Sequence, residues 1–426
     1  MNINDSLYHK IKFILHDRIQ LLFSDLYINF ILKFNKSQIL SNFFLYTPIK
    51  FNKNNQINIV FQNKGVFNEE ITYLFNDIDN INLIRLNRRV LKKLLNSSYN
   101  NKNINHLNWY QEKNKIENLH KYRNLLKRFI GIPKYNIFLI FNWGDGSTAE
   151  FTEYLKLYKI HTICIHKEGI SSKVFRESYL NIINKKRIKF LGKKIFVYNQ
   201  VTKQTLLKSF YKDEDIDVVG SVRFDHIFSL QNQRIDQKKV LIFHPSVNAQ
   251  LPDLLGLNCN FNWEELTNIF YNTLFKLLND FPSINFVVKI KNRDIENISK
   301  YITKPVKNLI IDRSTSSIDL LKDSKLCIGF NSTALIESSA FNIPTINFVP
   351  EHIYKKYNDY IIEYKSLVIN TADYDLIKNK IALNTIRTKP DKVKLNDLNE
   401  IVGNNTGNVK EIIVESVINL INDDKI

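Results

Sequence analysis

The spacing of hydrophobic residues changes from helical to strand-like near residue 50. Within residues 1 to 50, apolar side chains such as Ile11, Leu15 and Leu22 recur at helical intervals, which predicts a helical N-terminal segment. From residue 51 onward, short β-rich runs alternate with amphipathic segments of helical spacing. This alternation predicts mostly parallel strands with helices covering both faces of a sheet.

The predicted strands form two series separated by a polar linker over residues 223–237. The first series comprises 57–61, 81–86, 137–141, 162–166, 195–198 and 216–219, and the second comprises 240–243, 286–290, 309–311, 326–330 and 345–348. We therefore predict an α/β protein in four parts: a helical segment 1–50, a Rossmann-like domain 51–230, a second Rossmann-like domain 238–400 and a C-terminal helix 401–426. The Asn- and Lys-rich stretch 96–118 is predicted to be a surface insertion.

The amino-acid composition favours anionic partners but does not identify a particular one. The net charge is +18, with 60 Lys and Arg against 42 Asp and Glu, which favours nucleic acids, acidic lipid headgroups or phosphorylated substrates. No recognised nucleic-acid motif appears, so we expect no nucleic-acid partner. The sequence shows no secretory signal and no apolar run long enough to cross a membrane, which predicts a cytoplasmic protein. The amphipathic N-terminal segment either packs on the following domain or lies on an anionic membrane surface.

One βαβ unit over residues 326–348 is the most informative stretch of the chain. A strand-like run ends in Asn331-Ser332-Thr333, a helical segment follows, and Pro344 opens a second strand-like run. Free backbone N–H groups at a helix start favour an anion, so Ser332 and Thr333 are candidate phosphate ligands. Glu337 lies one turn after Thr333 and would hold ribose hydroxyls. The alternative is that the two hydroxyls only cap the helix.

Three further loops follow predicted strands, where open α/β sheets bind ligands. Asp145, in the turn Gly144-Asp145-Gly146, would orient a hydroxyl or remove its proton, or else cap the next helix. Glu168, beside Gly169, is the leading candidate for the general base, and a solvated loop glutamate is its alternative.

His244 is the third such candidate, because Pro245 holds it at the end of a strand. Its imidazole would donate to a phosphate oxygen or protonate a leaving group. Arg313 would face a phosphate from the loop before a later helix. No metal-like spacing of Cys or His is present, so we expect neither a metal nor a bound cofactor.

These motifs together resemble those of the bacterial GT-B glycosyltransferases of capsule and lipopolysaccharide assembly, particularly the sialyl-, polysialyl- and Kdo-transferases. The matching elements are Glu168-Gly169, His244-Pro245 and Ser332-Thr333. A further segment, residues 219–225 (VGSVRFD), resembles the Gly-x-Pro-Arg-Phe-Asp motif of CDP-glycerol glycerophosphotransferase-like enzymes, with Val222 in place of proline. In that resemblance Gly220 and Ser221 approach the donor.

The resemblance implies a GT-B-like fold, in which two Rossmann-like domains face a central cleft. It also implies a metal-independent transferase that moves a sugar from a nucleotide-sugar donor, such as a CMP-activated one, to a glycan or lipid-linked glycan acceptor. The N-terminal domain would bind the acceptor and the C-terminal domain the donor. Two alternative activities on the same fold stay open: that of a CDP-alcohol phosphotransferase and that of a UDP-sugar 2-epimerase. A hypothesis of another class is a noncatalytic glycan- or membrane-binding subunit of a polysaccharide assembly complex.

Overall fold

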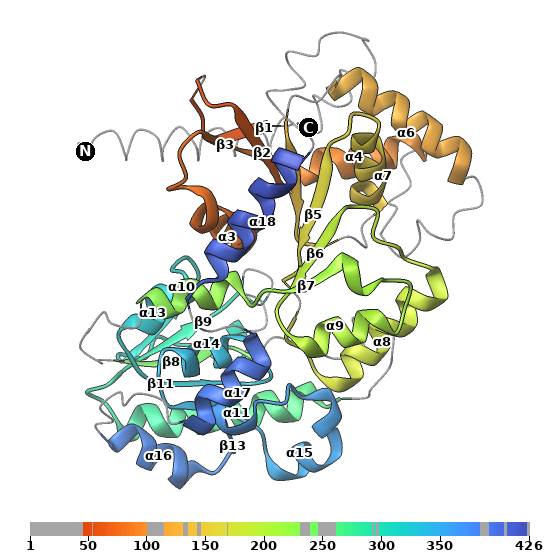
Figure 1. Cartoon of the computed structure of the whole chain (residues 1–426). Coiled ribbons are helices and arrows are strands. Elements are labelled where there is room, and N and C mark those ends of the chain that lie inside the picture. Colours follow the sequence, from red (N-terminus) through yellow and green to blue (C-terminus); the bar gives the residue numbers. More distant parts are fainter. Residues whose placement is uncertain are drawn as a thin grey trace.

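Two β-sheets, each covered by helices, make up the molecule (Figure 1). The computed structural model of the 426-residue chain describes residues 46–52, 54–99, 115–130, 135–142, 146–167, 169–230, 239–245, 261–291, 294, 298–383, 392–403 and 407–423. Both sheets are mostly parallel, as the alternation of strand and helix patterns predicts, so the predicted fold class is confirmed.

The N-terminal sheet has the strand order β1-β3-β2-β4-β5-β6-β7. Only β1 runs antiparallel, and it pairs with β3 at the edge of the sheet. The strands are β1 (Tyr46–Lys50), β2 (Ile57–Gln62), β3 (Ile81–Leu86), β4 (Ile137–Ile140), β5 (His161–Ile165), β6 (Lys194–Val197) and β7 (Ile216–Val218). The helices between them are α3 (Gly65–Phe75), α4 (Arg88–Ser98), α6 (Lys115–Ile130), α7 (Gly146–Lys156), α8 (Lys173–Lys186) and α9 (Gln200–Leu207), with a 3₁₀ turn at Asp213–Asp215.

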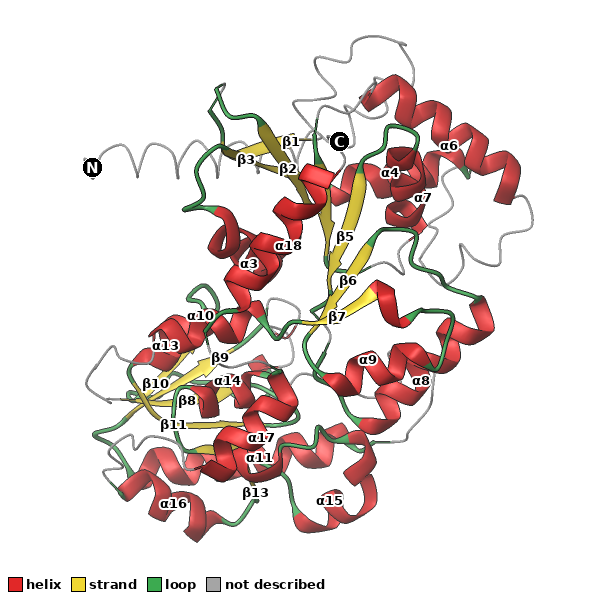
Figure 2. Ribbon diagram, viewed as in Figure 1, coloured by secondary structure: helices red, strands yellow, loops and turns green. Residues whose placement is uncertain are grey.

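The C-terminal sheet has the order β10-β9-β8-β11-β12-β13 and is parallel throughout. Its strands are β8 (Lys239–Phe243), β9 (Asn285–Lys289), β10 (Leu309–Asp312), β11 (Ser324–Gly329), β12 (Thr345–Asn347) and β13 (Ile369–Asn370). The remaining helices are α10 (Val222–Leu230), α11 (Trp263–Asp280), α13 (Ser317–Lys322), α14 (Ala334–Ala340), α15 (Glu351–Tyr357), α16 (Tyr374–Ala382), α17 (Lys392–Val402) and α18 (Val409–Asp423), with 3₁₀ turns at Asn358–Tyr360 and Lys365–Leu367. Figure 2 distinguishes these helices and strands by colour.

Three predicted boundaries differ from the structure. The predicted C-terminal helix 401–426 is not one helix, because α17 ends at Val402 and α18 begins at Val409. Residues 46–50 form strand β1, whereas the pattern predicts a helical segment over 1–50; Thr47 and Ile49 are β-branched, and Pro48 is tolerated because β1 is an edge strand. Residues 222–230, within the predicted linker, form α10, which buries Val222, Phe224 and Ile227 against its neighbours. Residues 1–45 and 231–238 lie outside the described residues. Of the predicted insertion 96–118, only the ends are described, and they belong to α4 and α6.

Side chains from the end of the chain complete the N-terminal core. Val409, Ile413, Val417 and Ile421 recur every four residues on α18, and all are at most 4% exposed. They pack with α3 against one face of the N-terminal sheet, beside Ile59 of β2. Figure 1 shows α18 crossing back to lie alongside α3. The chain therefore passes from the first lobe to the second and returns.

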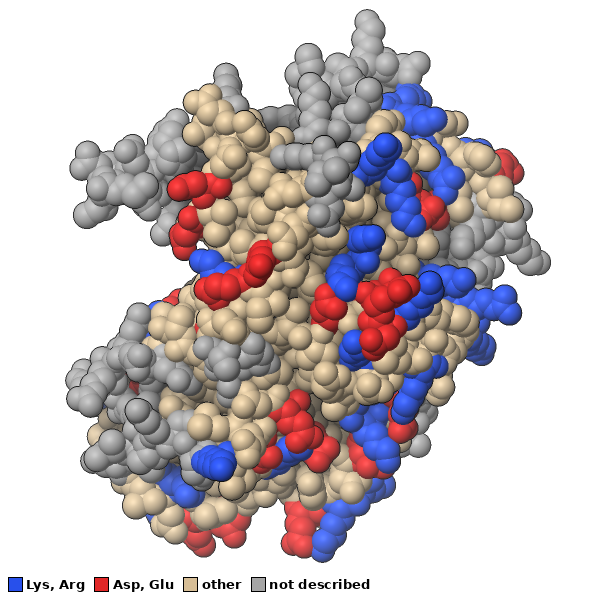
Figure 3. All heavy atoms as spheres, viewed as in Figure 1, with Lys and Arg blue, Asp and Glu red and all other residues tan. Residues whose placement is uncertain are grey.

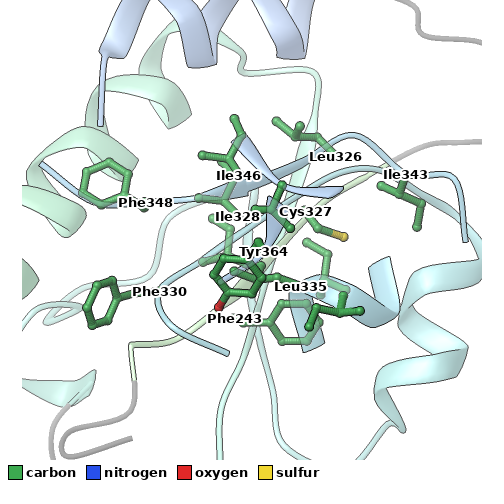
Figure 4. Close-up of a cluster of buried hydrophobic side chains, with 14 of the residues drawn as sticks. Phe243, Leu326, Cys327, Ile328, Phe330, Leu335, Ile343, Ile346, Phe348 and Tyr364 are labelled. Atoms are coloured by element: carbon green, nitrogen blue, oxygen red, sulfur yellow. The ribbon is translucent and has the colours of Figure 1, made fainter. Parts of the chain in front are cut away.

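The C-terminal core surrounds β8 and β11, whose side chains Phe243, Leu326 and Ile328 are buried among aromatic and aliphatic neighbours (Figure 4). Two residues of the N-terminal half, Ile170 and Tyr198, belong to the same buried cluster. Because they follow β5 and β6, the carboxyl edge of the N-terminal sheet lies against the C-terminal lobe.

Within the described residues, no helix is long and apolar enough to cross a membrane.

Candidate functional site

The strand order of the C-terminal sheet reverses between β8 and β11. Strand β8 comes first in the chain, and the following strands β9 and β10 extend the sheet on one side while β11, β12 and β13 extend it on the other. The carboxyl ends of β8 and β11 therefore form the reversal point of this sheet, which is the position where open α/β sheets bind ligands. His244 follows β8, and Asn331, Ser332 and Thr333 follow β11. The tertiary structure thus brings these two predicted loops to adjacent strand ends.

His244 is held firmly at this edge. Its backbone N–H donates to the Lys289 carbonyl at 3.1 Å, and its Nδ1 lies 2.7 Å from the Tyr271 hydroxyl oxygen. The residue is 8% exposed, and its buried Nε2 has no hydrogen-bond partner among the described residues. Burial lowers the pKa of His244 to about 4, with a smaller effect of the Lys291 charge in the same direction and an opposing effect of Asp294. At neutral pH the imidazole is therefore uncharged and carries one N–H donor.

A hollow of about 300 Å³ adjoins this histidine, a volume at the lower end of the range for small-molecule sites. It is lined by His244, Pro245, Trp263, Glu264, Thr267, Lys300 and Tyr301.

The loop after β11 is fixed by Asn331, which adopts a left-handed backbone conformation with φ of 46°. Its side chain accepts from the Ile362 N–H at 2.9 Å and donates to the Tyr360 carbonyl at 3.1 Å. Ser332 and Thr333 follow and are half-buried. The Ser332 hydroxyl accepts from the Ala334 N–H at 3.3 Å, whereas Thr333 makes no side-chain cap of α14. Helix capping thus engages Ser332 alone, and the phosphate-binding role of both residues stays a prediction.

Glu337 is engaged by a partner that the sequence pattern does not suggest. Both its carboxylate oxygens accept from Arg223, at 2.5 Å from Nε and 2.9 Å from Nη2, and the two side chains are 7% and 14% exposed. Burial alone would lower the pKa of Arg223, but the carboxylates of Glu337, Glu70 and Glu69 raise it overall. This bidentate pair joins α10 to α14 (Figure 1). A ribose contact by Glu337 would have to share these oxygens, and it remains a prediction.

A hollow of about 340 Å³ lies beside this ion pair and contains Glu69, Glu70 and Tyr73 from α3, Arg223 and His226 from α10, and Asp319 and Lys322 from α13. Figure 3 shows the surface indented between the two lobes, with acidic and basic side chains on its walls. Burial raises the pKa of Glu70 to about 7, although the nearby charges of Lys167 and Arg223 act in the opposite direction. The hollow therefore contains a carboxyl group that exchanges a proton near neutral pH.

Structural contacts dominate the segment that resembles the Gly-x-Pro-Arg-Phe-Asp motif. The fully buried Asp225 accepts from the backbone N–H groups of Val409 and Lys410, both at 3.2 Å, and from the Tyr73 hydroxyl at 3.1 Å. Asp225 therefore anchors the first turn of α18.

Two glycines allow the chain to cross at this point. Gly220 has φ of +95° and Gly403 has φ of +82°, and a Cβ on Gly403 would lie 1.8 Å from the Tyr198 carbonyl oxygen and 2.9 Å from the Gly220 Cα. Ser221 is completely buried, and its hydroxyl has no partner among the described residues. The donor contacts predicted for Gly220 and Ser221 remain predictions.

Asp145 and Glu168, the two candidate bases, lie outside the described residues. The neighbours of Glu168 are described. The Gly169 carbonyl accepts from the Thr202 hydroxyl at 3.3 Å, and a Cβ on Gly169 would lie 2.7 Å from the Tyr198 ring. Ile170 belongs to the C-terminal core, so the chain on one side of Glu168 abuts the second lobe.

Arg313 is exposed in the loop after β10. Strand β9 separates β10 from β8, which places this loop two strand spacings, about 10 Å, from the His244 loop. The structure does not bring Arg313 to the reversal point.

Sequence reasoning missed Tyr271, Glu70 and the pairing of Arg223. Tyr271 lies on the buried face of α11, and Glu70 lies within the apolar pattern of α3, so neither carries a local signal of chemistry. Their partners come from other segments of the chain. A charged residue inside an otherwise apolar face is the one available hint for Glu70.

Comparisons with known proteins support the fold alone. No protein-family model matches the sequence, and no curated protein matches it. A structure of a histidine variant of the wall teichoic acid polymerase TagF, soaked with CDPG, is similar with a TM-score of 0.53 and 13% identity, covering 97% of this chain and 99% of that one. The UDP-GlcNAc 2-epimerase of Methanocaldococcus jannaschii is similar with a TM-score of 0.50 and 12% identity, covering 84% of this chain and 99% of that one. The shared architecture is the two-domain GT-B fold.

Proposed function

We propose that this protein is a GT-B glycosyltransferase that moves a sugar from a nucleotide-sugar donor, such as a CMP-activated one, to a hydroxyl acceptor in capsule or lipopolysaccharide synthesis. The observation that carries the proposal is the position of the His244 loop and the Asn331–Thr333 loop. They leave adjacent strands at the point where the order of the C-terminal sheet reverses.

In this proposal the donor phosphate lies at the carboxyl ends of β8 and β11. The Tyr271 hydroxyl is assigned as the hydrogen-bond donor to His244 Nδ1, which places the single imidazole proton on Nε2. The Nε2–H group then donates to the departing phosphate. Since negative charge grows on that phosphate in the transition state, fixed donors from His244, Ser332 and Thr333 lower the barrier more than they stabilise the bound donor.

The acceptor hydroxyl must lose a proton as it attacks the sugar carbon. Glu168 is the proposed base, with Asp145 as the alternative, and the N-terminal domain would hold the acceptor. The contacts of Gly169 and Ile170 support this assignment, because they carry the chain beside Glu168 toward the donor lobe.

A second candidate is transfer of a phosphoalcohol from a CDP-linked donor. The segment from Gly220 to Asp225 favours it, since it resembles the motif of CDP-glycerol glycerophosphotransferase-like enzymes and lies at the crossing between the lobes. The TagF structure, which matches over 97% of this chain, agrees with this candidate in fold.

Measurement of nucleotide release separates the candidate reactions. Purified protein is incubated with CMP-, CDP- and UDP-linked donors, and binding of each is checked by the rise in melting temperature. Release of CMP from a CMP-sugar supports the glycosyltransferase, and release of CMP from a CDP-alcohol supports the phosphotransferase. Interconversion of UDP-sugars would instead support the epimerase, and glycan or membrane binding without turnover of any donor would support the noncatalytic subunit.

A matched pair of variants tests the role of His244. The change His244→Asn should reduce turnover by about a hundredfold or more, the scale of losing a fixed hydrogen-bond donor to charge that develops in the transition state. The exposed His352, whose side chain is 62% exposed, provides the control variant His352→Asn. Equal turnover of the two variants, or no stabilisation by any of the donors, would overturn the proposal.

A further inference from the structure

Three cationic side chains converge on one aromatic ring at the carboxyl edge of the N-terminal sheet. Phe141 directly follows β4, and the charged groups of Lys64, Arg88 and Lys167 lie 4.3, 5.5 and 5.9 Å from the centre of its ring. Each comes from a different segment: Lys64 follows β2, Arg88 opens α4 after β3, and Lys167 follows β5. Cations at such distances are attracted to the face of the ring, which holds the three groups near one another.

This cluster lies where the order of the N-terminal sheet reverses. Strand β2 has β3 on one side and β4 on the other, and β5, β6 and β7 continue beyond β4. The reversal therefore falls between β2 and β4, whose carboxyl ends carry Lys64 and Phe141. This is the same topological position that the His244 and Ser332 loops occupy in the C-terminal sheet.

Two of the three cations lie at helix ends that favour an anion. Lys64 is the residue before the first turn of α3 and Arg88 is the first residue of α4, so both lie at the positive ends of helices. No acidic residue occupies the first turn of α3, α4 or α8, although carboxylates are the residues that stabilise this position. No described carboxylate forms an ion pair with Arg88 or Lys167; the buried Glu70 acts on Lys167 only at longer range.

We infer that Lys64, Arg88 and Lys167 form an anion-binding site at the N-terminal reversal point and that its ligand is a phosphate group. The guanidinium of Arg88 can pair with two phosphate oxygens, while the two ammonium groups supply compact positive charge. The identity of the ligand rests on the proposed function: in a transferase of this kind the phosphate belongs to the acceptor, and the acceptor is a phosphomonoester or phosphodiester. The site lies at the carboxyl edge of the N-terminal sheet, where β5 ends three residues before Glu168 in the chain.

The experiment uses the full chain and two probes, each of which carries a phosphate group. The first probe is inorganic phosphate, titrated by calorimetry in the presence of saturating UDP or CDP so that the proposed nucleotide site of the C-terminal lobe is filled. The second is phosphatidylcholine vesicles with and without phosphatidic acid. Lys64→Gln, Arg88→Gln and Lys167→Gln are made singly and together, and the matched controls are Arg89→Gln and Lys173→Gln, which remove exposed charges nearby.

Each single change at the site should weaken phosphate binding about tenfold, the effect of one lost charged hydrogen bond, and the triple variant should lose it. The controls should bind as the unchanged protein does, and the melting temperature of every variant is measured to show that it is folded at the temperature of the titration. Loss of vesicle binding in the triple variant identifies a lipid headgroup as the source of the phosphate, whereas loss confined to inorganic phosphate identifies a water-soluble phosphoester. The inference is overturned if the triple variant binds phosphate normally, or if the controls lose as much affinity as the site variants.

Failure of the anion site and failure of the transferase give different results. If no nucleotide binds but phosphate binding still depends on the three cations, the anion site stands and the transferase proposal fails. If donors turn over with dependence on His244 while the triple variant binds phosphate and uses acceptor normally, the transferase stands and the anion site fails.

Discussion

Glu70 should make the stability of this protein depend on pH in the direction opposite to that of an ordinary paired carboxylate. The side chain is 6% exposed, and burial raises its pKa from 4.5 to about 7. Between these two values the unfolded chain releases the proton while the folded chain retains it. The folded state therefore loses stability as pH rises through this window, and above about pH 7 the loss is complete.

The shift corresponds to about 3 kcal/mol at ~1.36 kcal/mol for each pKa unit. The change Glu70→Gln keeps the shape but removes the ionisation. At pH 5 the free energies of unfolding of the variant and the unchanged protein should differ by less than about 1 kcal/mol, because folded Glu70 is protonated and the unfolded chain has released only part of its proton. At pH 8 the variant should be more stable by an amount approaching about 3 kcal/mol.

Urea denaturation at half-unit intervals from pH 5 to pH 8 measures this difference directly. The control is Glu69→Gln, since Glu69 is an exposed neighbour on the same helix and lines the same hollow. A difference between Glu70→Gln and the unchanged protein that stays constant with pH would contradict a raised pKa. So would a less stable Glu70→Gln at pH 8, because attraction by Lys167 and Arg223 would then outweigh burial.

Three further changes test the contacts between the lobes. Asp225→Ala leaves the N–H groups at the start of α18 and the Tyr73 hydroxyl without this acceptor. We expect the free energy of unfolding to fall by about 3 kcal/mol or more and amide exchange along α18 to become faster. Unchanged exchange along α18 would contradict the anchoring role of Asp225. Glu337→Gln leaves Arg223 as a buried charge without its carboxylate partner, so the free energy of unfolding measured in urea should fall by about 3–5 kcal/mol. The double variant Arg223→Met, Glu337→Leu should recover much of this loss. A double variant as unstable as Glu337→Gln would argue against the pairing. Gly403→Ala places a Cβ 1.8 Å from a backbone carbonyl oxygen and should lower the melting temperature by several degrees. Gly407 has a similar φ of +80° but open space around it, so Gly407→Ala should lower the melting temperature less. Equal decreases in the two variants would exclude the close approach as the cause.

The layers and the local elements of this protein follow from its sequence. Runs such as 137–140 and 326–329 are buried along their whole length, and continuous apolar runs between amphipathic segments indicate parallel strands covered on both faces. The βαβ unit over residues 326–348 was predictable for the same reason, since Asn331 and Pro344 punctuate it. These are local properties, because the period of apolar residues depends only on the geometry of one strand or one helix.

The neighbours of each strand end, by contrast, are settled only in the folded protein. The His244 and Ser332 loops lie at adjacent strand ends because β8 pairs with β11, although β9 and β10 lie between these two strands in the chain. No short motif encodes such a pairing. The candidate site could therefore be predicted as separate loops, whereas their meeting at one reversal point could not.

Contacts between distant segments are likewise settled only in the folded protein. Lys64, Arg88 and Lys167 meet at Phe141 only because β2, β3, β4 and β5 are neighbours in the folded sheet. The return of α18 to the N-terminal lobe and the ion pair between α10 and α14 likewise join segments that are far apart in the chain. The period of apolar residues is set within one helix or strand, so the sequence alone predicts it. Strand order and ion pairing depend on the packing of whole layers, and the free energy of that packing is summed over residues that are far apart in the chain. Only the tertiary structure therefore decides them.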